Sequence, residues 1–371
     1  MAAAAALACL AGASSASPIT AADRKKGLAE YFQRLERVAP RVHVLRQPGG
    51  FHLNGIGNVL IVEQSDGVVL VDSGASKGVG MRVVEAVKRL TVKPVKAVVI
   101  THWHNDHSLG LPAILEAWPR ARVIAGRRTV ERIKGGAMQA VPFAPSTDYD
   151  TKRRAQLQGY IGTLGPNMTD AKLTESERRG WRESLAVMPA RMDEAPGTYV
   201  VTPTEAVDDR LVIEDPLAPV EVLFLGRANT DGDVEVWLPK QRVVATGDVV
   251  TGPAPYEFNV YPSESVAVLR KLKALPFVAL VPGHGPVQRD RHGLDLLIGF
   301  NEAVIAYVGP RAKTMTLEEA SKGLDVEPYR LAIAGKDPWT RSWFDQYALT
   351  PLVDSVYREA RGEPLGPPGK P

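Results

Sequence analysis

The sequence predicts an α/β fold in which two packed β-sheets are flanked by helices. Short segments rich in Val, Ile and Leu recur along the chain, each bounded by Gly, Pro or Asp, as is typical of buried strands. Longer segments with helical periodicity lie between them, so hairpins are mixed with crossover helices. At 371 residues the chain is long enough to bury a large core.

The predicted strands and helices can be placed by residue range. The earlier strands are Val42–Arg46, Val59–Glu63, Val68–Asp72, Ala97–Thr101 and Arg122–Ala125. The later strands are Arg210–Glu214, Val220–Leu225, Val234–Leu238, Arg242–Thr246 and Val278–Val281. Helices are predicted at Val79–Leu90, Leu109–Trp118, Glu264–Leu275 and Gly293–Tyr307.

Residues 135–203 interrupt this alternation. Asp150–Ile161 and Thr174–Val187 have helical patterns, and Thr174 with Glu177 reads as a capping box. Structureless loops of this length are uncommon, so we expect a helical lid or insertion within a main domain of residues 23–310.

The C-terminal residues 311–371 are predicted to form a helical extension. Its helices are expected at Thr316–Ser321, Glu327–Ala334 and Arg341–Glu359. Four aromatic residues there have the spacing of a helix face that packs into a core rather than of a binding stripe: Trp339, Trp343, Phe344 and Tyr347.

The N-terminal residues 1–22 read as a signal peptide. The first ten residues are rich in Ala and Leu, and small residues at Ala13 and Ala16 fit a cleavage site. We therefore expect a periplasmic or secreted protein; a lipoprotein anchored through Cys9 and a disordered tail are the alternatives. Cys9 is the single cysteine, so the mature chain would have no disulfide and no cysteine metal site. No later segment is apolar for long enough to span a membrane.

Charge narrows the range of partners. The net charge of +3 indicates no general affinity for polyanions, and no nucleic-acid-binding module is visible. Residues 120–191, however, contain 14 Lys and Arg against 7 Asp and Glu. A positive lid would attract an anionic small-molecule substrate, whereas solvated helix faces would explain the same excess without function.

The richest local feature is the run His102-Trp103-His104-Asn105-Asp106-His107, directly after the apolar segment 97–100. A strand that ends there would deliver these side chains to one edge of a sheet, and His102 and His104 could point the same way. Imidazole and carboxylate suit Zn²⁺ with one coordination position open to water. A chance set of polar loop residues is the alternative.

This run resembles the His-x-His-x-Asp-His signature of the metallo-β-lactamase-fold hydrolases, and three further segments extend the resemblance. Residues 58–62 and 67–74 are similar to the opening hairpin of that superfamily. Thr246-Gly247-Asp248 resembles the segment with the metal-bridging Asp, and Val281–Gly285 resembles the segment with the last His, here His284. The resemblance implies a four-layer αββα sandwich and a general zinc hydrolase of the glyoxalase II-like branch.

One departure from that pattern is Asn229. The family places a Gly-x-x-His-Thr segment here, but this chain reads Gly226-Arg227-Ala228-Asn229-Thr230, with no His between His107 and His284. An amide oxygen is a weak ligand for zinc. The resemblance therefore implies one or two Zn²⁺ ions, with a complete second site and a weakened first site. The implied metal residues are His102, His104, Asp106, His107, Asn229, Asp248 and His284.

The implied reaction is hydrolysis by a metal-bound hydroxide. A metal lowers the pKa of bound water from about 15.7 to about 7, and the hydroxide would attack an ester, thioester, lactone or amide. Asp106 is the expected catalytic residue, as a metal ligand that also orients or transfers a proton. Asp72 is either a partner that orients a ligand or a strand-ending turn residue.

Several other functions remain alternatives. A phosphodiesterase or nuclease of the same fold would explain a basic lid. A metal-poor, non-catalytic binding protein would explain Asn229. An iron-dependent oxygenase or reductase fits less well, because the di-iron reductases of this fold carry Glu where this chain has His104. The Asp248 position also differs from that of most true β-lactamases, and no Gly-x-Ser-x-Gly or Walker motif is present.

Overall fold

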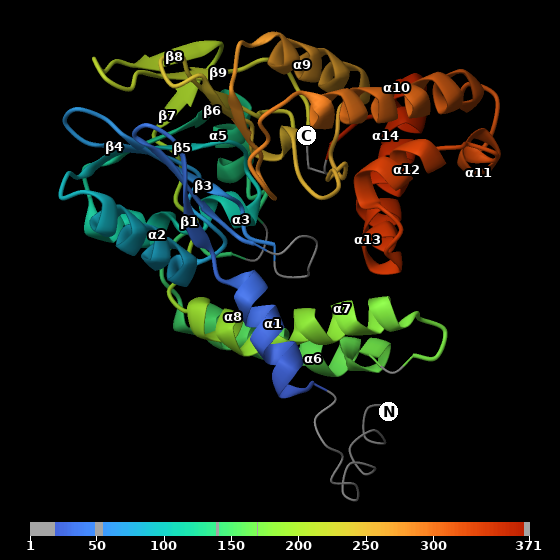
Figure 1. The fold of residues 1–371 in the computed structure, drawn as a ribbon, viewed down its shortest axis with the longest axis horizontal. Helices are drawn as coiled ribbons and strands as arrows, with labels where there is room; N and C mark the ends of the chain where they lie inside the picture. The colour runs from blue at the N-terminus through green and yellow to red at the C-terminus, as the bar shows by residue number, and fades with distance from the viewer. Residues whose placement is uncertain (1–18, 49–54, 139–140, 169, 367–371) are drawn as a thin grey trace, which may run out of the picture.

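The computed structural model describes residues 19–48, 55–138, 141–168 and 170–366. Two β-sheets pack face to face with helices on both outer sides, as Figure 1 shows. The first sheet contains β1 (Arg34–Ala39), β2 (Val42–Arg46), β3 (Val59–Glu63), β4 (Val68–Val71), β5 (Val95–Ile100), β6 (Arg122–Gly126) and β7 (Glu205–Val207). The second contains β8 (Arg210–Ile213), β9 (Val220–Leu223), β10 (Glu235–Leu238), β11 (Val243–Ala245) and β12 (Ala279–Val281).

Both sheets mix antiparallel and parallel pairing. In the first sheet, β1 to β4 form an antiparallel meander and β4 to β7 run parallel. In the second, β8 to β11 are antiparallel, and β12 pairs parallel to β11. Parallel neighbours end at the same edge of a sheet, so the loops after β4, β5, β11 and β12 can meet there.

Three apolar layers hold the sandwich together. Between the sheets lies a cluster of small branched side chains that includes Val62, Val99 and Val236. On the outside of the first sheet, α2 (Lys77–Leu90) and α4 (Leu111–Ala117) bury Val83, Leu111 and their neighbours. Outside the second sheet, α9 (Pro262–Ala274) and α10 (His292–Ala312) do the same. The predicted αββα sandwich is therefore confirmed.

The strand prediction missed β1 and β7. Both lie at edges of the first sheet, where one side of the strand has no partner in the sheet. β1 carries charged, exposed residues, and β7 has three residues, so neither shows the apolar run of a buried strand. All ten predicted strands exist, with ends that differ by up to two residues.

The helix prediction was wrong in a few places. Helices α1 (Ala21–Tyr31), α5 (Arg127–Lys134) and α8 (Met188–Glu194) were not predicted. The single helix expected after His107 is two helices, α3 (Asn105–Ser108) and α4, separated by Gly110. A Cβ at Gly110 would lie 1.9 Å from the Ser73 carbonyl oxygen, so the backbone passes too closely there for a larger residue.

Most of the remaining helices lie outside the sandwich. Residues 135–203, named the insertion here, contain α6 (Thr147–Leu164), α7 (Glu175–Ala186) and α8, which lie beside α1 (Figure 1). The predicted capping box of Thr174 and Glu177 begins α7. The C-terminal helices are α11 (Leu317–Ser321), α12 (Glu327–Ala334), α13 (Pro338–Trp343) and α14 (Thr350–Ala360), with a π-helical segment at Phe344–Leu349. The boundary expected after residue 310 falls inside α10.

The insertion and the C-terminal helices touch where α7 meets α13. A Cβ at Gly180 would lie 2.2 Å from the ring of Trp339, so glycine permits this approach. The rings of Trp181 and Trp339 meet edge to face at 5.4 Å, and the Ser176 hydroxyl donates to Asp337. The predicted signal peptide lies mostly outside the described residues. No described helix is both long and apolar enough to cross a bilayer.

Candidate metal centre

Four strand ends place the central side chains. Asp72 follows β4, His102 follows β5, Asp248 lies just beyond β11, and His284 lies just beyond β12. The parallel pairs β4–β5 and β11–β12 end at the same edges of the two sheets, which brings residues distant in sequence together. The Asn58 side chain ties the two sheets at this edge by donating to the carbonyls of residues 282 and 285.

The first group of metal-ligand side chains is His102, His104 and Asp248. Their ligand atoms lie within 4.8 Å of one another. His102 Nε2 is 2.9 Å from His104 Nδ1 and 3.6 Å from Asp248 Oδ2. His102 and Asp248 are buried, whereas His104 is half-buried.

The second group is Asp106, His107 and His284, whose ligand atoms also lie within 4.8 Å of one another. Asp106 Oδ2 is 2.9 Å from His284 Nε2, and His107 Nε2 is 3.3 Å from the same nitrogen. Asp248 Oδ1 lies 3.2 Å from His107 Nε2 and 3.5 Å from His284 Nε2. Asp248 therefore faces both groups, one through each oxygen.

Asp72 orients His107. Its Oδ1 accepts a hydrogen bond from the backbone N–H of Thr101 at 2.8 Å, and its Oδ2 lies 2.8 Å from His107 Nδ1. Both roles considered for Asp72 are therefore filled, since it also turns the chain after β4 with a φ of 66°. A proton on Nδ1 leaves the Nε2 lone pair of the neutral ring directed at Asp248 and His284.

The donor atoms fit bound divalent cations. Ring nitrogens and carboxylate oxygens converge here, so a proton or a metal ion must offset their mutual repulsion. Burial lowers the pKa of His104 to about 3, which keeps that imidazole in the neutral form that binds metal. Burial alone would lower the pKa of His107, but the carboxylates of Asp248, Asp106 and Asp72 raise it well above its usual value.

The backbone is fitted closely around these groups. A Cβ at Gly283 would lie 2.0 Å from Asp248 Oδ1, and one at Gly57 would lie 2.6 Å from the His107 ring. Asp248 Oδ1 is buried, and its close polar neighbours are the ring nitrogens of His107 at 3.2 Å and His284 at 3.5 Å. A buried carboxylate oxygen between two imidazoles suits a ligand shared by metal ions.

Asn229 is bonded to the segment after β11 and has one oxygen available. Its Nδ2 donates to the Tyr256 carbonyl, and its buried Oδ1 has no hydrogen-bond partner in the described chain. Asp233 builds the turn by accepting from the backbone N–H of Thr230 at 2.7 Å, and Asp231 pairs with Arg132. Asp231 and Asp233 thus fix the turn that carries Asn229. Ligation by Asn229 stays a prediction.

Two further residues at the centre were not anticipated. The Asn259 amide lies 3.3 Å from His104 Nε2. The Tyr256 ring lies 5.2 Å from the His284 ring, and a Cβ at Gly55 would be within 4 Å of Tyr256 Oη, Asp106 Oδ2 and His284 Cε1. Both residues belong to the irregular segment after β11, where no periodic pattern could have indicated them.

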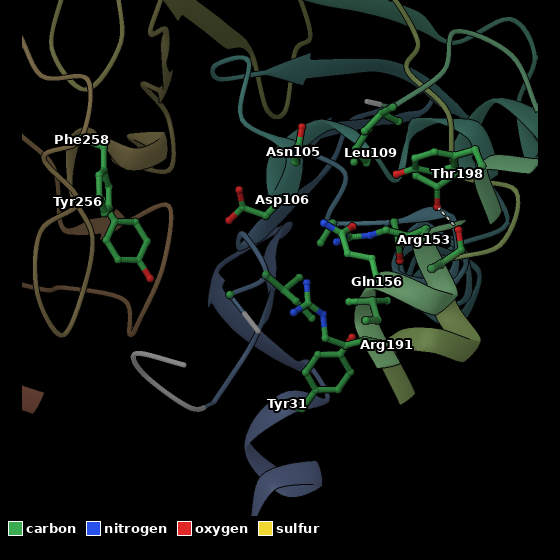
Figure 2. Close-up of a pocket in the computed structure, with 18 of the residues that line it drawn as sticks. Tyr31, Asn105, Asp106, Leu109, Arg153, Gln156, Arg191, Thr198, Tyr256 and Phe258 are labelled. Atoms are coloured by element: carbon green, nitrogen blue, oxygen red, sulfur yellow. Dashed lines mark hydrogen bonds between the residues drawn. The ribbon is translucent and has the colours of Figure 1, made fainter. Parts of the chain in front are cut away.

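A cavity of about 470 Å³ opens beside Asp106 (Figure 2). The insertion and α1 supply one wall, which includes Tyr31, Arg153 and Arg191. A second wall, named the aromatic wall here, consists of Tyr256, Phe258, Trp343 and Tyr347. Trp339, Trp343 and Phe344 are buried in one apolar cluster with Tyr347 packed against it, as predicted. Trp343 and Tyr347 also line this cavity.

Known proteins resemble this chain in sequence and in fold. A linear primary-alkylsulfatase of Pseudomonas sp. is 24% identical over 322 residues, which cover 82% of this chain and 56% of that protein. An atrochrysone carboxyl ACP thioesterase of Aspergillus chevalieri is 34% identical over 90 residues, 24% of this chain and 29% of the thioesterase.

Solved structures show the same fold. A sec-alkylsulfatase from Pseudomonas sp. matches with a TM-score of 0.61 at 16% identity, over 94% of this chain and 53% of the other. A metallo-beta-lactamase from Pontibacter korlensis matches with a TM-score of 0.51 at 18% identity, over 73% of this chain and 99% of the other. The chain thus spans about half the length of the alkylsulfatases it matches.

The family itself is shown by a sequence profile. The profile of the metallo-beta-lactamase superfamily matches residues 53–284, more than half of the chain. That range contains every residue of the two ligand groups and ends at His284. The chain belongs to the metallo-beta-lactamase superfamily.

Proposed function

We propose that this protein is a hydrolase that uses two metal ions, most simply Zn²⁺, to cleave an ester-type bond. One observation carries the proposal: two ligand groups meet at Asp248, and Asp106 of the second group lines a cavity large enough for a small molecule. The candidate bonds from the sequence are ester, thioester, lactone and amide. The alkylsulfatase among the relatives adds the sulfate ester, and the thioesterase supports the thioester.

The residues divide into those that would hold metal and those that would face the substrate. His102, His104 and Asp248, with Asn229 as a weak additional ligand, would hold the first ion. Asp106, His107 and His284 would hold the second. When bound, the metal ions would activate water and polarise the bond to be cleaved.

Asp106 and Tyr256 are placed to act on the substrate. Asp106 is the ligand whose carboxylate reaches the cavity, with 27% of its side chain exposed, so it can hold or pass a proton at the bond that breaks. The Tyr256 hydroxyl lies across from it and can donate a hydrogen bond to a developing oxyanion. Burial and the charges of Asp248 and Asp106 raise the pKa of Tyr256, which keeps this donor protonated.

The pairing of the basic residues within 120–191 favours a small-molecule substrate over a nucleic acid. Most of the excess positive charge counted in the sequence is paired on the surface, for example in Arg122–Glu205 and Arg127–Asp208. A phosphodiesterase that binds nucleic acid would need an open basic face instead. We also propose export to the periplasm or medium, supported by the Ala-rich residues 1–16, with N-terminal sequencing of the exported chain as its test.

The test of the function is metal analysis together with a substrate panel. Purified protein should contain up to two zinc equivalents and hydrolyse at least one member of a panel of alkyl sulfate, carboxylic ester, thioester, lactone and phosphodiester. Chelation should remove the activity, and zinc should restore it. A protein that binds no metal under any loading condition would instead be the non-catalytic binding protein.

A further inference from the structure

The two walls of the cavity differ in chemistry. On the aromatic wall, Tyr347 stacks on Trp343 at 4.3 Å and meets Phe258 edge to face at 5.0 Å. On the opposite wall, Arg153 of α6 and Arg191 of α8 point into the cavity between Tyr31 and Asp106, as Figure 2 shows. The aromatic wall and the two guanidinium groups thus line opposite sides of one cavity of about 470 Å³.

The neighbouring carboxylates of the insertion are engaged elsewhere. Asp150 accepts from the backbone N–H of Gly197 with both oxygens. Glu194 accepts from the Tyr31 hydroxyl at 2.6 Å and pairs with Arg82. Asp150 and Glu194 are therefore both engaged in these bonds.

Other cations of the same helices differ from Arg153. Arg154 pairs with Asp193 at 3.3 Å, and Lys152 pairs with Asp148 at 2.7 Å. Within the described residues, Arg153 donates to the neutral side chain of Gln156 at 2.6 Å and forms no ion pair. Among these three cations of α6, Arg153 lines the cavity, and it is the one that forms no ion pair with a carboxylate of the described residues.

The two guanidinium groups are close enough to affect each other. Burial lowers the pKa of Arg191; Tyr31 acts against this, Arg153 lowers the pKa further, and Asp106 raises it. Two like charges in a partly desolvated cavity repel each other, and an anion placed between them would relieve that repulsion. Guanidinium groups bind oxyanions with paired hydrogen bonds, so the arrangement favours a carboxylate or sulfate.

We propose that Arg153 and Arg191 form a binding site for the oxyanion group of an amphiphilic substrate, whose apolar part lies on the aromatic wall. The inference rests on the proposed function, because it names the substrate class of the same cavity. The shared chemistry is a single anionic head, either a carboxylate or a sulfur oxyanion, on an alkyl or aryl body.

Binding can be measured without turnover. Titration calorimetry of the full chain, as purified, with octanoate, octanesulfonate and neutral 1-octanol separates the two heads from the apolar body, since none of these can be hydrolysed. We expect one or both anions to bind and octanol to bind at least tenfold more weakly. Arg153→Gln and Arg191→Gln should each weaken anion binding by about ten- to a hundredfold, the usual range for a charged hydrogen bond.

The matched control is Arg154→Gln, which removes the neighbouring charge of α6 that does not line the cavity and pairs with Asp193. It should bind the anions as the wild type does. Arg191→Lys, which keeps the charge, should retain part of the binding and guards against a folding defect in Arg191→Gln. If that variant still fails to fold, Arg153→Gln alone decides. Unchanged anion binding in Arg153→Gln, or an equal loss in Arg154→Gln, overturns the proposal.

A kinetic arm separates this inference from the function beneath it. An aryl ester with a free carboxylate should be cleaved with a lower KM than its neutral counterpart. Arg153→Gln should raise the KM of the carboxylate ester much more than that of the neutral ester, which removes the preference. Hydrolysis of both esters with no dependence on Arg153 would overturn the anion site alone. Anion binding that depends on Arg153, without hydrolysis of any panel member, would support the site and overturn the proposed function.

Discussion

The metal centre and the cavity walls are built by different means. The donors of the centre stand at the ends of paired strands, so the registers of β4–β5 and β11–β12 fix their positions. The walls come from helices of the insertion and the C-terminal region, together with the irregular segment after β11. A sheet edge can place a ligand precisely enough for metal chemistry, whereas helices packed over it determine which molecule reaches the metal.

Removal of a candidate ligand of the second group should have the largest effect, because it alters the metal centre and leaves the cavity walls in place. His107→Ala or His284→Ala should lose one metal equivalent, and turnover should fall at least a hundredfold. Mutating a residue that only hydrogen-bonds to a metal ligand already lowers metal affinity or activity by about ten- to a hundredfold, and loss of the ligand itself should cost more. His292→Ala, at an exposed position on α10, is the control and should keep both. Wild-type metal content and turnover in either ligand variant would show that the site is assigned wrongly.

A substitution at Glu257 tests whether the segment after β11 can be stabilised without any change in the metal centre. Burial raises the pKa of Glu257 from 4.5 to about 7, while the Asn301 amide acts in the opposite direction. Because the folded-state pKa is raised, ionisation costs stability progressively as the pH rises from about 4.5 to about 7, and the loss stays constant above that. Glu257→Gln should therefore gain up to about 3 kcal/mol at pH 8 and little at pH 4.5.

Chemical unfolding at the two pH values measures this difference, and metal content serves as the control because Glu257 contacts none of the ligands in the described structure. The same gain at both pH values would mean that the effect comes from repacking rather than from ionisation. A loss of metal in the variant would mean that the segment and the centre are not separable.

Asp72 tests the support behind a ligand. Asp72→Ala removes the acceptor that fixes the His107 ring, so zinc affinity should fall by about ten- to a hundredfold while the fold is retained. Competition with a chromophoric chelator gives the affinity. Asp66→Ala, a surface carboxylate paired with Lys96, is the matched control. Equal zinc affinity in Asp72→Ala and the wild type would mean that Asp72 only turns the chain after β4 and does not support metal binding through His107.

Asn229 gives the smallest expected effect. Asn229→His would replace a weak amide ligand with imidazole, so the first ion should bind more tightly and its occupancy should depend less on added zinc. Calorimetric zinc titration of both proteins measures this change. Identical stoichiometry and affinity would mean that Asn229 does not limit metal binding, and a loss of affinity would mean that its bond to the Tyr256 carbonyl matters more.

The same contrast explains what could be predicted from the sequence. The candidate metal ligands lie in short motifs at strand ends, where local spacing and apolar runs are informative. The sandwich was therefore predicted correctly, and the sequence named the side chains that the structure brings together. Arg153, Arg191 and Tyr256 lie in different, irregularly spaced segments, and only the packing of α6, α8 and the chain after β11 brings them to one cavity. The positive charge of residues 120–191 was visible in the sequence, but the sequence did not show that Arg154 is paired with a carboxylate and Arg153 is not.

The contact between Gly180 and Trp339 has a consequence for the size of molecule that can enter. Since a single methyl group at position 180 would collide with the indole at 2.2 Å, even Gly180→Ala must displace the Trp339 ring or move α7 and α13 apart. The two helices belong to the insertion and the C-terminal region, which supply the opposing walls of the cavity. We therefore expect larger side chains at position 180 to change the distance between the walls, with every candidate metal ligand and both arginines left in place.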